Sequence, residues 1–335
     1  MSEPELPGAL RDELRSAWHR YLDRVAPLRP ALHGVCRRLT GNLWEAEDLV
    51  QDTLLRGFAT LGSIHHEIEN PRAYLLRTAT NLWIDAQRRH ASEAHALGAA
   101  DTPSAPPSPD AGARDAGERL LQRLPPQERA AVVLKDAFDM SLEEIAGILR
   151  TSVGAVKAAL HRGRGRLAEP ESGAASRRPR PSVALVDRFV ALYGAADVRG
   201  LVALMLDGGS VENVGSSVEF GRENFPRENG WFQRAVFGHP EWPAELQYTG
   251  ARLARADFEG EAIILGFTTR RGREALEQVL RIEEVDGQVA RLRGYAFCPE
   301  TMREVGKALG LHVRTGFYRY PTAAPGRGYD EPPVK

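Results

Sequence analysis

Two polar stretches cut this 335-residue chain into separate folding segments. Residues 91–117 and 169–182 are rich in Ala, Pro, Ser and Gly and show no apolar period, so both are predicted to be linkers. The length alone also predicts more than one domain. The expected organisation is a helical segment at 1–90, a linker at 91–117, a second helical segment at 118–168, a basic linker at 169–182, a mixed segment at 183–320 and a tail at 321–335.

Charge and composition exclude several classes of protein. The formal net charge of −1 excludes a uniformly basic coat for nucleic acid, although a locally basic domain stays open. No apolar run approaches the roughly 20 residues that a membrane span needs, and the acidic N-terminus has no apolar core of a secretory signal. Cys36 and Cys298 lie far apart without a CxxC partner, so we expect neither a disulfide framework nor a zinc site, and no cofactor.

The first segment is predicted to be helical. Apolar residues recur at i, i+3 and i+4 over residues 31–39 and again over 46–58. A third helix is expected to start at Asn70-Pro71, because Asn caps helices with its side chain and Pro suits the first helical position. The residues expected to be buried on this third helix are Leu75, Thr78, Ala79 and Leu82.

The second segment has the spacing of a helix-turn-helix. Pro125-Pro126 begins one helix, and Ser141 with Glu144 three residues later forms a capping box for the next. Ser152 is expected to cap a further helix, which such a unit places in the major groove of DNA. Its exposed face would carry Lys157, His161, Arg162 and Arg164.

This part of the chain is also locally basic. Eight Arg or Lys residues stand against two Glu between positions 150 and 181, which suits neutralisation of DNA phosphates. The alternative is a solvated helical hairpin followed by a basic linker, since basic helices are common.

Two constellations stand out in the first segment. Acidic residues cluster around Gln51 at Glu45, Glu47, Asp48 and Asp52, which suits a basic partner surface or, alternatively, a plain solvated face. Basic and aromatic residues share the third helix, and single-stranded DNA requires such a combination of charge and π faces. They are Tyr74, Arg77, Asn81, Trp83, Asp85, Arg88 and Arg89. The alternative is that Tyr74 and Trp83 are core aromatics.

The third segment changes its period. One or two helices over 182–206 precede four stretches with strand character, and a helix is expected at 299–310. The strands are predicted at 246–258, 261–269, 274–285 and 288–297, separated by the turn signals Glu259-Gly260, Arg271-Gly272 and Asp286-Gly287. The predicted class of this segment is α+β, with helices on a curved antiparallel sheet.

These motifs resemble a known family. Residues 46–58 (AEDLVQDTLLRGF) and 70–89 are similar to region 2 of extracytoplasmic-function sigma factors, and residues 121–167 are similar to region 4 of the same family. The two blocks occur in the family's order and cover roughly the first half of the chain. The resemblance implies two all-α regions, binding to bacterial core RNA polymerase and direction of that enzyme to promoters.

The resemblance also implies roles for individual residues. The polymerase-binding candidates are Glu47, Asp48, Leu49, Gln51 and Asp52. The candidates for recognising and melting the minus-10 element are Tyr74, Asn81, Trp83, Asp85, Arg88 and Arg89. The minus-35 candidates are Ser152, Lys157, His161, Arg162 and Arg164. Ala158 and Ala159 depart from the family, which often has Ser or Arg at these positions. Fewer direct contacts with bases are then available, so recognition of DNA shape is expected to matter more.

The third segment resembles the SnoaL-type, nuclear-transport-factor-2-like (NTF2-like) cone that some sigma factors carry as a C-terminal extension. The resemblance rests on strand order, the helical start and a Gly-rich motif at Asp207, Gly208 and Gly209. It implies control of sigma activity by this domain. Such cones enclose a pocket where an Asp–His pair can act in acid–base chemistry, with Asp207, His239 and Asp257 as conceivable members.

We expect no enzyme, although catalysis, binding of an unknown small molecule and an interdomain or polymerase contact are all open for this domain. The expected location is the cytoplasm, with nucleoid association when bound to polymerase and no membrane partner. The alternative function is a helix-turn-helix repressor fused to a small-molecule-binding or cyclase-like domain. A repressor should bind duplex operator DNA without polymerase.

Overall fold

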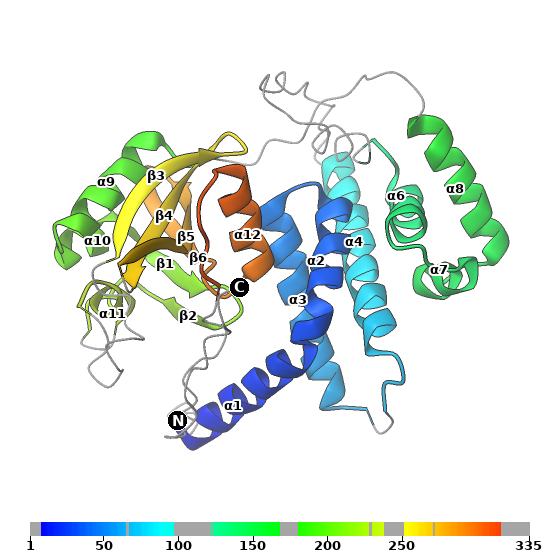
Figure 1. Cartoon of the computed structure of the whole chain (residues 1–335), viewed down its shortest axis with the longest axis horizontal. Helices are drawn as coiled ribbons and strands as arrows, with labels where there is room; N and C mark the ends of the chain where they lie inside the picture. Colours follow the sequence, from blue (N-terminus) through cyan, green and yellow to red (C-terminus); the bar gives the residue numbers. More distant parts are fainter. Residues whose placement is uncertain are drawn as a thin grey trace. The chain divides into compact units, whose positions relative to one another are not determined.

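The computed structural model describes residues 8–64, 67–96, 121, 123–167, 180–227, 230–237, 251–270 and 272–315. The chain divides into two compact units, Met1–Arg177 and Arg178–Lys335, and Figure 1 shows the helices of the first and the sheet of the second. No described helix is both long enough and apolar enough to cross a bilayer.

The N-terminal unit is all-helical. Its elements are α1 (Gly8–Val25), η1 (Ala26–Leu28), α2 (Arg29–Thr40), α3 (Leu43–Leu61), α4 (Pro71–Ala96), α6 (Pro126–Val132), the π-helical turn η2 (Val133–Ala137), α7 (Leu142–Leu149) and α8 (Val153–Leu167). Helix α4 runs six residues into the stretch expected to be a linker from residue 91, so that predicted boundary is wrong.

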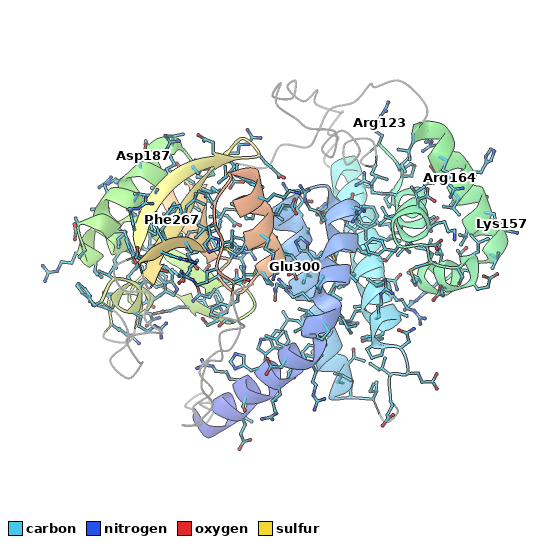
Figure 2. The ribbon with its side chains drawn as sticks, viewed as in Figure 1. Arg123, Lys157, Arg164, Asp187, Phe267 and Glu300 are labelled. Carbon is cyan, nitrogen blue, oxygen red and sulfur yellow. The ribbon has the colours of Figure 1, made fainter. Side chains whose placement is uncertain are left out.

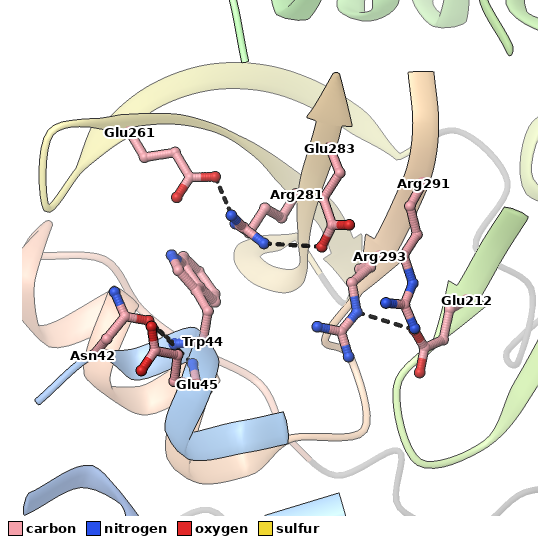
Figure 3. Close-up of polar contacts among 9 residues, drawn as sticks. All are labelled: Asn42, Trp44, Glu45, Glu212, Glu261, Arg281, Glu283, Arg291 and Arg293. Carbon is pink, nitrogen blue, oxygen red and sulfur yellow. Dashed lines mark hydrogen bonds and ion pairs between the residues drawn. The ribbon is translucent and has the colours of Figure 1, made fainter. Parts of the chain in front are cut away.

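Local signals define where these helices begin and end. The Asn42 side chain accepts hydrogen bonds from the backbone N–H groups of Trp44 and Glu45 at 2.9 and 3.0 Å (Figure 3). Asn70 accepts from Ala73 N at the start of α4, and Ser141 with Glu144 forms the predicted capping box of α7. Helix α7 ends where Arg150 adopts a left-handed conformation, with φ of 52°. The predicted helix-turn-helix is therefore confirmed.

One hydrophobic core joins the two predicted helical segments. It includes Leu32, Leu54 and Leu76 from α2–α4 together with Leu134 and Ile145 from the second segment. Both segments thus fold as one unit and not as separate modules on a tether. On α4, Leu75 and Ala79 are buried as predicted, whereas Thr78 and Leu82 are only partly buried.

Helix α1 was not predicted. Trp18 and Tyr21 pack on Phe58 of α3, with ring centroids 5.3 and 5.5 Å apart. The apolar residues Leu10, Leu14 and Trp18 recur every four positions, so the helical period was present in the sequence.

The C-terminal unit is α+β. It contains α9 (Val183–Gly194), α10 (Val198–Leu204), β1 (Met205–Asn213), β2 (Ser217–Phe220), α11 (Trp231–Phe237), β3 (Arg252–Phe258), β4 (Glu261–Arg270), β5 (Arg273–Val285), β6 (Gln288–Gly294) and α12 (Pro299–Ala308). The strand order is β2-β1-β6-β5-β4-β3. Strand β1 pairs with β6 in parallel, so the sheet is mixed and the expectation of a purely antiparallel sheet is wrong.

Two of the predicted hairpins have the expected turns. Glu259 and Gly260, and likewise Asp286 and Gly287, all have positive φ, which is the backbone of a two-residue type I′ turn. Strands β1 and β2 were not predicted. One face of the sheet packs against α9, α10 and α11 around Phe189, Leu201 and Phe232.

Several expectations fall on residues outside the described part of the chain. They include His239, Arg271, residues 246–250 of the first predicted strand, residues 97–117 and 169–179 of the two predicted linkers, and the tail from 321 onward.

Candidate nucleic-acid interface

The acidic cluster of α3 divides into an inner and an outer half. Glu47 is fully buried, and its carboxylate accepts hydrogen bonds from Arg29 Nη2 at 2.7 and 2.9 Å and from Gln51 Nε2 at 2.6 Å. Burial alone would raise the pKa of Glu47, but the nearby Arg29 and His33 and the hydrogen bonds from Arg29 and Gln51 outweigh it and lower the pKa.

Two polymerase-binding candidates therefore need correction. Glu47 pairs inside the unit, and Leu49 belongs to its hydrophobic core, so neither side chain is part of an exposed acidic face. The surface of α3 instead carries Asp48, half-buried, and Asp52, exposed, followed by Leu55 with 54% of its side chain exposed. The outward position of Leu55 was not expected, because an apolar side chain alone predicts burial.

The minus-10 candidates on α4 do not share one face. Asp85, Arg88 and Arg89 are exposed, and Arg88 lies 3.6 Å from Asp85. Asn81 is half-buried, and Tyr74 packs partly against the core. Trp83 is only 4% exposed and belongs to the core, so the alternative of a core aromatic describes its position here.

Arg129 of α6 covers Trp83. Its guanidinium carbon lies 5.2 Å from the centroid of the Trp83 ring, and Nη1 donates a hydrogen bond to the carbonyl oxygen of Leu39 at 2.9 Å. Burial lowers the pKa of Arg129 to about 10. Arg129 thus covers one face of the Trp83 ring, and little of the ring is exposed.

Helix α8 presents the predicted cationic surface only in part. Ser152 caps the helix by accepting from Ala155 N at 3.2 Å, and Lys157 and His161 are exposed. Figure 2 shows Lys157 on the outer side of α8, pointing away from α6. Among the described residues no ion pair involves Lys157, so its charge is available to a ligand.

The arginines of α8 are paired with acidic side chains. Arg162 Nε donates to Glu128 of α6 at 2.8 Å, and Arg166 lies 3.3 Å from the same carboxylate. Arg164 donates through Nε and Nη2 to Asp136, and these hydrogen bonds raise the pKa of the Arg164 guanidinium. Of the four cationic residues of α8, three are thus partly neutralised within the unit.

The departure at Ala158 and Ala159 concerns one position, not two. Ala158 is exposed, whereas Ala159 is 6% exposed and packs into the core with Val156 and Leu160. Of the two positions, only Ala158 therefore lies on the outward face of α8.

The motif of the C-terminal unit lies on β1. Asp207 and Gly208 are exposed, and Arg222 Nη1 donates to Asp207 at 2.9 Å. Gly209 is required, because a Cβ there would lie 2.8 Å from the carbonyl oxygen of Leu206. Asp257 is exposed and pairs with Arg255, so neither aspartate lines an apolar pocket. In the described part of the chain no group of His, Cys, Asp or Glu could hold a metal ion.

A second feature of this unit is a set of charge pairs along the sheet. The carboxylate of Glu212 accepts from Arg291 and Arg293, and Arg281 donates to Glu261 and Glu283 (Figure 3). Arg281, Arg293 and Glu261 are all buried, which such charges tolerate only when paired. The pairs compensate these charges within the sheet.

Comparison with known proteins matches the two helical blocks to family models. Residues 25–93 match Sigma-70 region 2, and residues 115–167 match Sigma-70 region 4. The chain is 32% identical over 160 residues to the ECF RNA polymerase sigma factor SigM of Mycobacterium tuberculosis, covering 47% of this chain and 74% of SigM. The chain belongs to the ECF RNA polymerase sigma factor family.

Another relative within the family extends further along the chain. The ECF RNA polymerase sigma factor SigG of Mycobacterium tuberculosis is 30% identical over 248 residues, covering 62% of each protein. The chain thus spans about three fifths of the length of SigG. Among solved structures, the Mycobacterium tuberculosis sigma factor SigJ matches with a TM-score of 0.33 and 21% identity, covering 84% of this chain and 98% of SigJ.

Proposed function

We propose that this chain is a sigma factor that binds core RNA polymerase and directs it to promoter DNA. The observation that carries the proposal is the presence of regions 2 and 4, in the family's order, in one helical unit. The helix-turn-helix in that unit exposes Lys157 and His161 on its second helix. The protein then acts by binding and positioning, without catalysing a reaction of its own.

Each surface has a separate role in this proposal. The outer half of α3, with Asp48, Asp52 and Leu55, contacts a basic and partly apolar surface of polymerase. The exposed residues Asp85, Arg88 and Arg89 of α4 contact the minus-10 element. Binding of a flipped-out base in a pocket offsets the free-energy cost of unstacking that base. Helix α8 enters the major groove of the minus-35 element.

We also propose that the C-terminal unit is an NTF2-like domain that regulates sigma activity. The mixed six-stranded sheet with helices on one face supports this fold. The exposed positions of Asp207 and Asp257 give no support to acid–base catalysis. Because this unit regulates and does not read DNA in this proposal, a chain truncated after residue 168 should change the amount of transcript without changing which promoters are used.

The decisive experiment is run-off transcription with purified core polymerase. The wild-type chain should co-elute with core enzyme and yield promoter-dependent transcripts. Asp52→Arg should abolish co-elution, because it places a cation against a basic surface. Glu13→Arg, a charge reversal at an exposed position of α1, is the matched control and should have no effect.

The repressor alternative makes an opposite prediction. A repressor binds duplex operator without polymerase, whereas a sigma factor should bind free promoter DNA poorly. Tight, sequence-specific binding of the free chain, together with no co-elution with core polymerase, would overturn the sigma function.

A further inference from the structure

Glu128 of α6 contacts two arginines of α8 at once. Its side chain is 7% exposed, Oε1 accepts from Arg162 Nε at 2.8 Å, and Oε2 lies 3.3 Å from Arg166 Nη1. A buried carboxylate is stable only with such partners. Arg162 and Arg166 are one helical turn apart on the same face of α8, so both can reach the one carboxylate.

A close helix crossing fixes this carboxylate relative to α8. The crossing is at Gly163, where a Cβ would lie 2.9 Å from Val132 Cγ2 and 3.5 Å from Glu128 Cβ. A side chain at position 163 would therefore crowd Val132, so α6 and α8 pack closely at this point. This packing places Glu128 beside α8, where its two carboxylate oxygens contact Arg162 and Arg166.

The way in which Arg162 is held leaves its terminal nitrogens free. Its hydrogen bond to Glu128 uses Nε, and its side chain remains 56% exposed. Within the described residues no other hydrogen bond or ion pair engages Arg162. Its two Nη groups form a donor fork that matches paired acceptors, such as guanine O6 and N7 or two phosphate oxygens.

Arg164 provides the contrast within the same helix. Asp136 engages both Nε and Nη2 of Arg164, so one edge of that guanidinium is already occupied. Figure 2 shows Arg164 on the side of α8 that faces α6, while Lys157 points away. Two acidic residues that precede the helix-turn-helix, Glu128 of α6 and Asp136 of η2, thus hold two arginines of its second helix in different ways.

We propose that Glu128 is a positioning residue for promoter recognition: it holds Arg162 by Nε so that the Nη fork faces paired acceptors of the minus-35 duplex. The proposal rests on the proposed sigma function. It assigns Glu128 a role in DNA binding without a DNA contact of its own. Arg166 lies 3.3 Å from the other oxygen of the same carboxylate.

The test uses holoenzyme assembled from full-length chain and core polymerase, on promoters carrying every base at each minus-35 position. Arg162→Ala should weaken promoter binding roughly tenfold, because a good bidentate contact has about that effect. Glu128→Ala should match it, and the double variant should be no weaker than either single one. Glu128→Gln should stay close to wild type, since the amide oxygen still accepts from Nε. Asp136→Asn, which releases Arg164 in place of Arg162, is the matched comparison: it should strengthen binding to DNA of any sequence and leave base preference unchanged.

The set of promoters also shows which DNA group accepts hydrogen bonds from Arg162. Loss of preference at one base pair identifies a guanine edge, whereas equal weakening on all promoters with a shallower salt dependence identifies phosphate. Either result supports the positioning role. Thermal unfolding of each variant shows whether a loss comes from the fold.

Three results would overturn the positioning role alone while the wild-type chain remains an active sigma factor. They are an Arg162→Ala variant that binds like wild type, effects of Glu128→Ala and Arg162→Ala that multiply, and a Glu128→Gln variant as weak as Glu128→Ala with an unchanged unfolding midpoint. A wild-type chain that gives no promoter-dependent transcript would overturn the sigma function, and this proposal with it.

Discussion

Two Arg–Glu pairs of the helical unit have the same chemistry and different surroundings. In the Arg29–Glu47 pair the side chains are 7% and 0% exposed, whereas in the Arg162–Glu128 pair they are 56% and 7% exposed. In the first pair both side chains are buried. In the second pair only the carboxylate is buried, so the arginine can still contact a ligand.

The difference shows that an acidic residue has no fixed role on a helix. Removing one partner of a fully buried pair leaves a charge without compensation and destabilises a protein strongly. Removing the carboxylate from a half-exposed pair leaves an arginine that water can solvate. The first pair should therefore act on stability and the second on the orientation of a binding group.

The largest expected effect is at Glu47. Glu47→Ala should lower the free energy of unfolding of the helical unit by about 3–5 kcal/mol, because Arg29 then remains buried without its carboxylate. Urea unfolding followed by circular dichroism measures the change. Glu13→Ala, at an exposed acid of α1, is the control and should stay within about 0.5 kcal/mol of wild type.

Replacing both partners tests whether the loss comes from the uncompensated charge. The double variant Arg29→Met, Glu47→Leu should recover much of the stability that Glu47→Ala loses, because an apolar pair of similar volume fills the site. A double variant as unstable as Glu47→Ala would mean that packing, and not charge, accounts for the loss.

A smaller effect is expected at Arg129, which joins the two segments of the helical unit. Arg129→Ala should cost about 2–3 kcal/mol through the lost contact with Trp83 and the lost hydrogen bond to Leu39. It should also let the segments separate, which energy transfer between dyes at the exposed positions Glu13 and Lys157 would report as a longer distance. Lys135→Ala, in the same segment but far more exposed to solvent, should leave that distance unchanged.

Much of this architecture could be predicted, because its signals are local. Side-chain caps at Asn70 and Ser141 and the turn at Asp286-Gly287 depend on a few neighbouring residues, and the structure confirms all three. Strand β1 was missed since Gly208 and Gly209 disfavour strands, and its parallel partner β6 lies some 80 positions later in the chain.

The candidate site was predictable by element but not by side chain. Helices α3, α4 and α8 were located correctly, yet Glu47, Trp83 and Ala159 are buried. Glu47 pairs in the core with Arg29 of another helix, and the Trp83 ring is covered by Arg129, which lies 46 residues later in the chain. Such long-range pairing leaves no periodic mark in either helix.

Acid should weaken the helical unit through Glu47. The pKa of Glu47 is lower in the folded protein than in the unfolded chain, so the unfolded state binds a proton first. The stability that this charge provides is present above the unfolded pKa and is lost as pH falls through the folded pKa. Unfolding midpoints measured from pH 7 downward should fall in acid for wild type and less so for Glu47→Gln. Equal slopes for both proteins would contradict this.

The smallest expected effect separates pairing from stability in α8. Asp136→Asn should change the free energy of unfolding by less than about 1 kcal/mol, because Arg164 and Asp136 are 54% and 41% exposed and water screens their attraction. The same change frees an edge of Arg164, so binding of the holoenzyme to DNA of any sequence should strengthen and its salt dependence should steepen by about one phosphate contact. Chemical denaturation and binding at several salt concentrations measure the two quantities. A large loss of stability would mean that the Arg164–Asp136 pair contributes to folding as the buried Arg29–Glu47 pair does. The proposed difference between buried and exposed ion pairs would then be wrong.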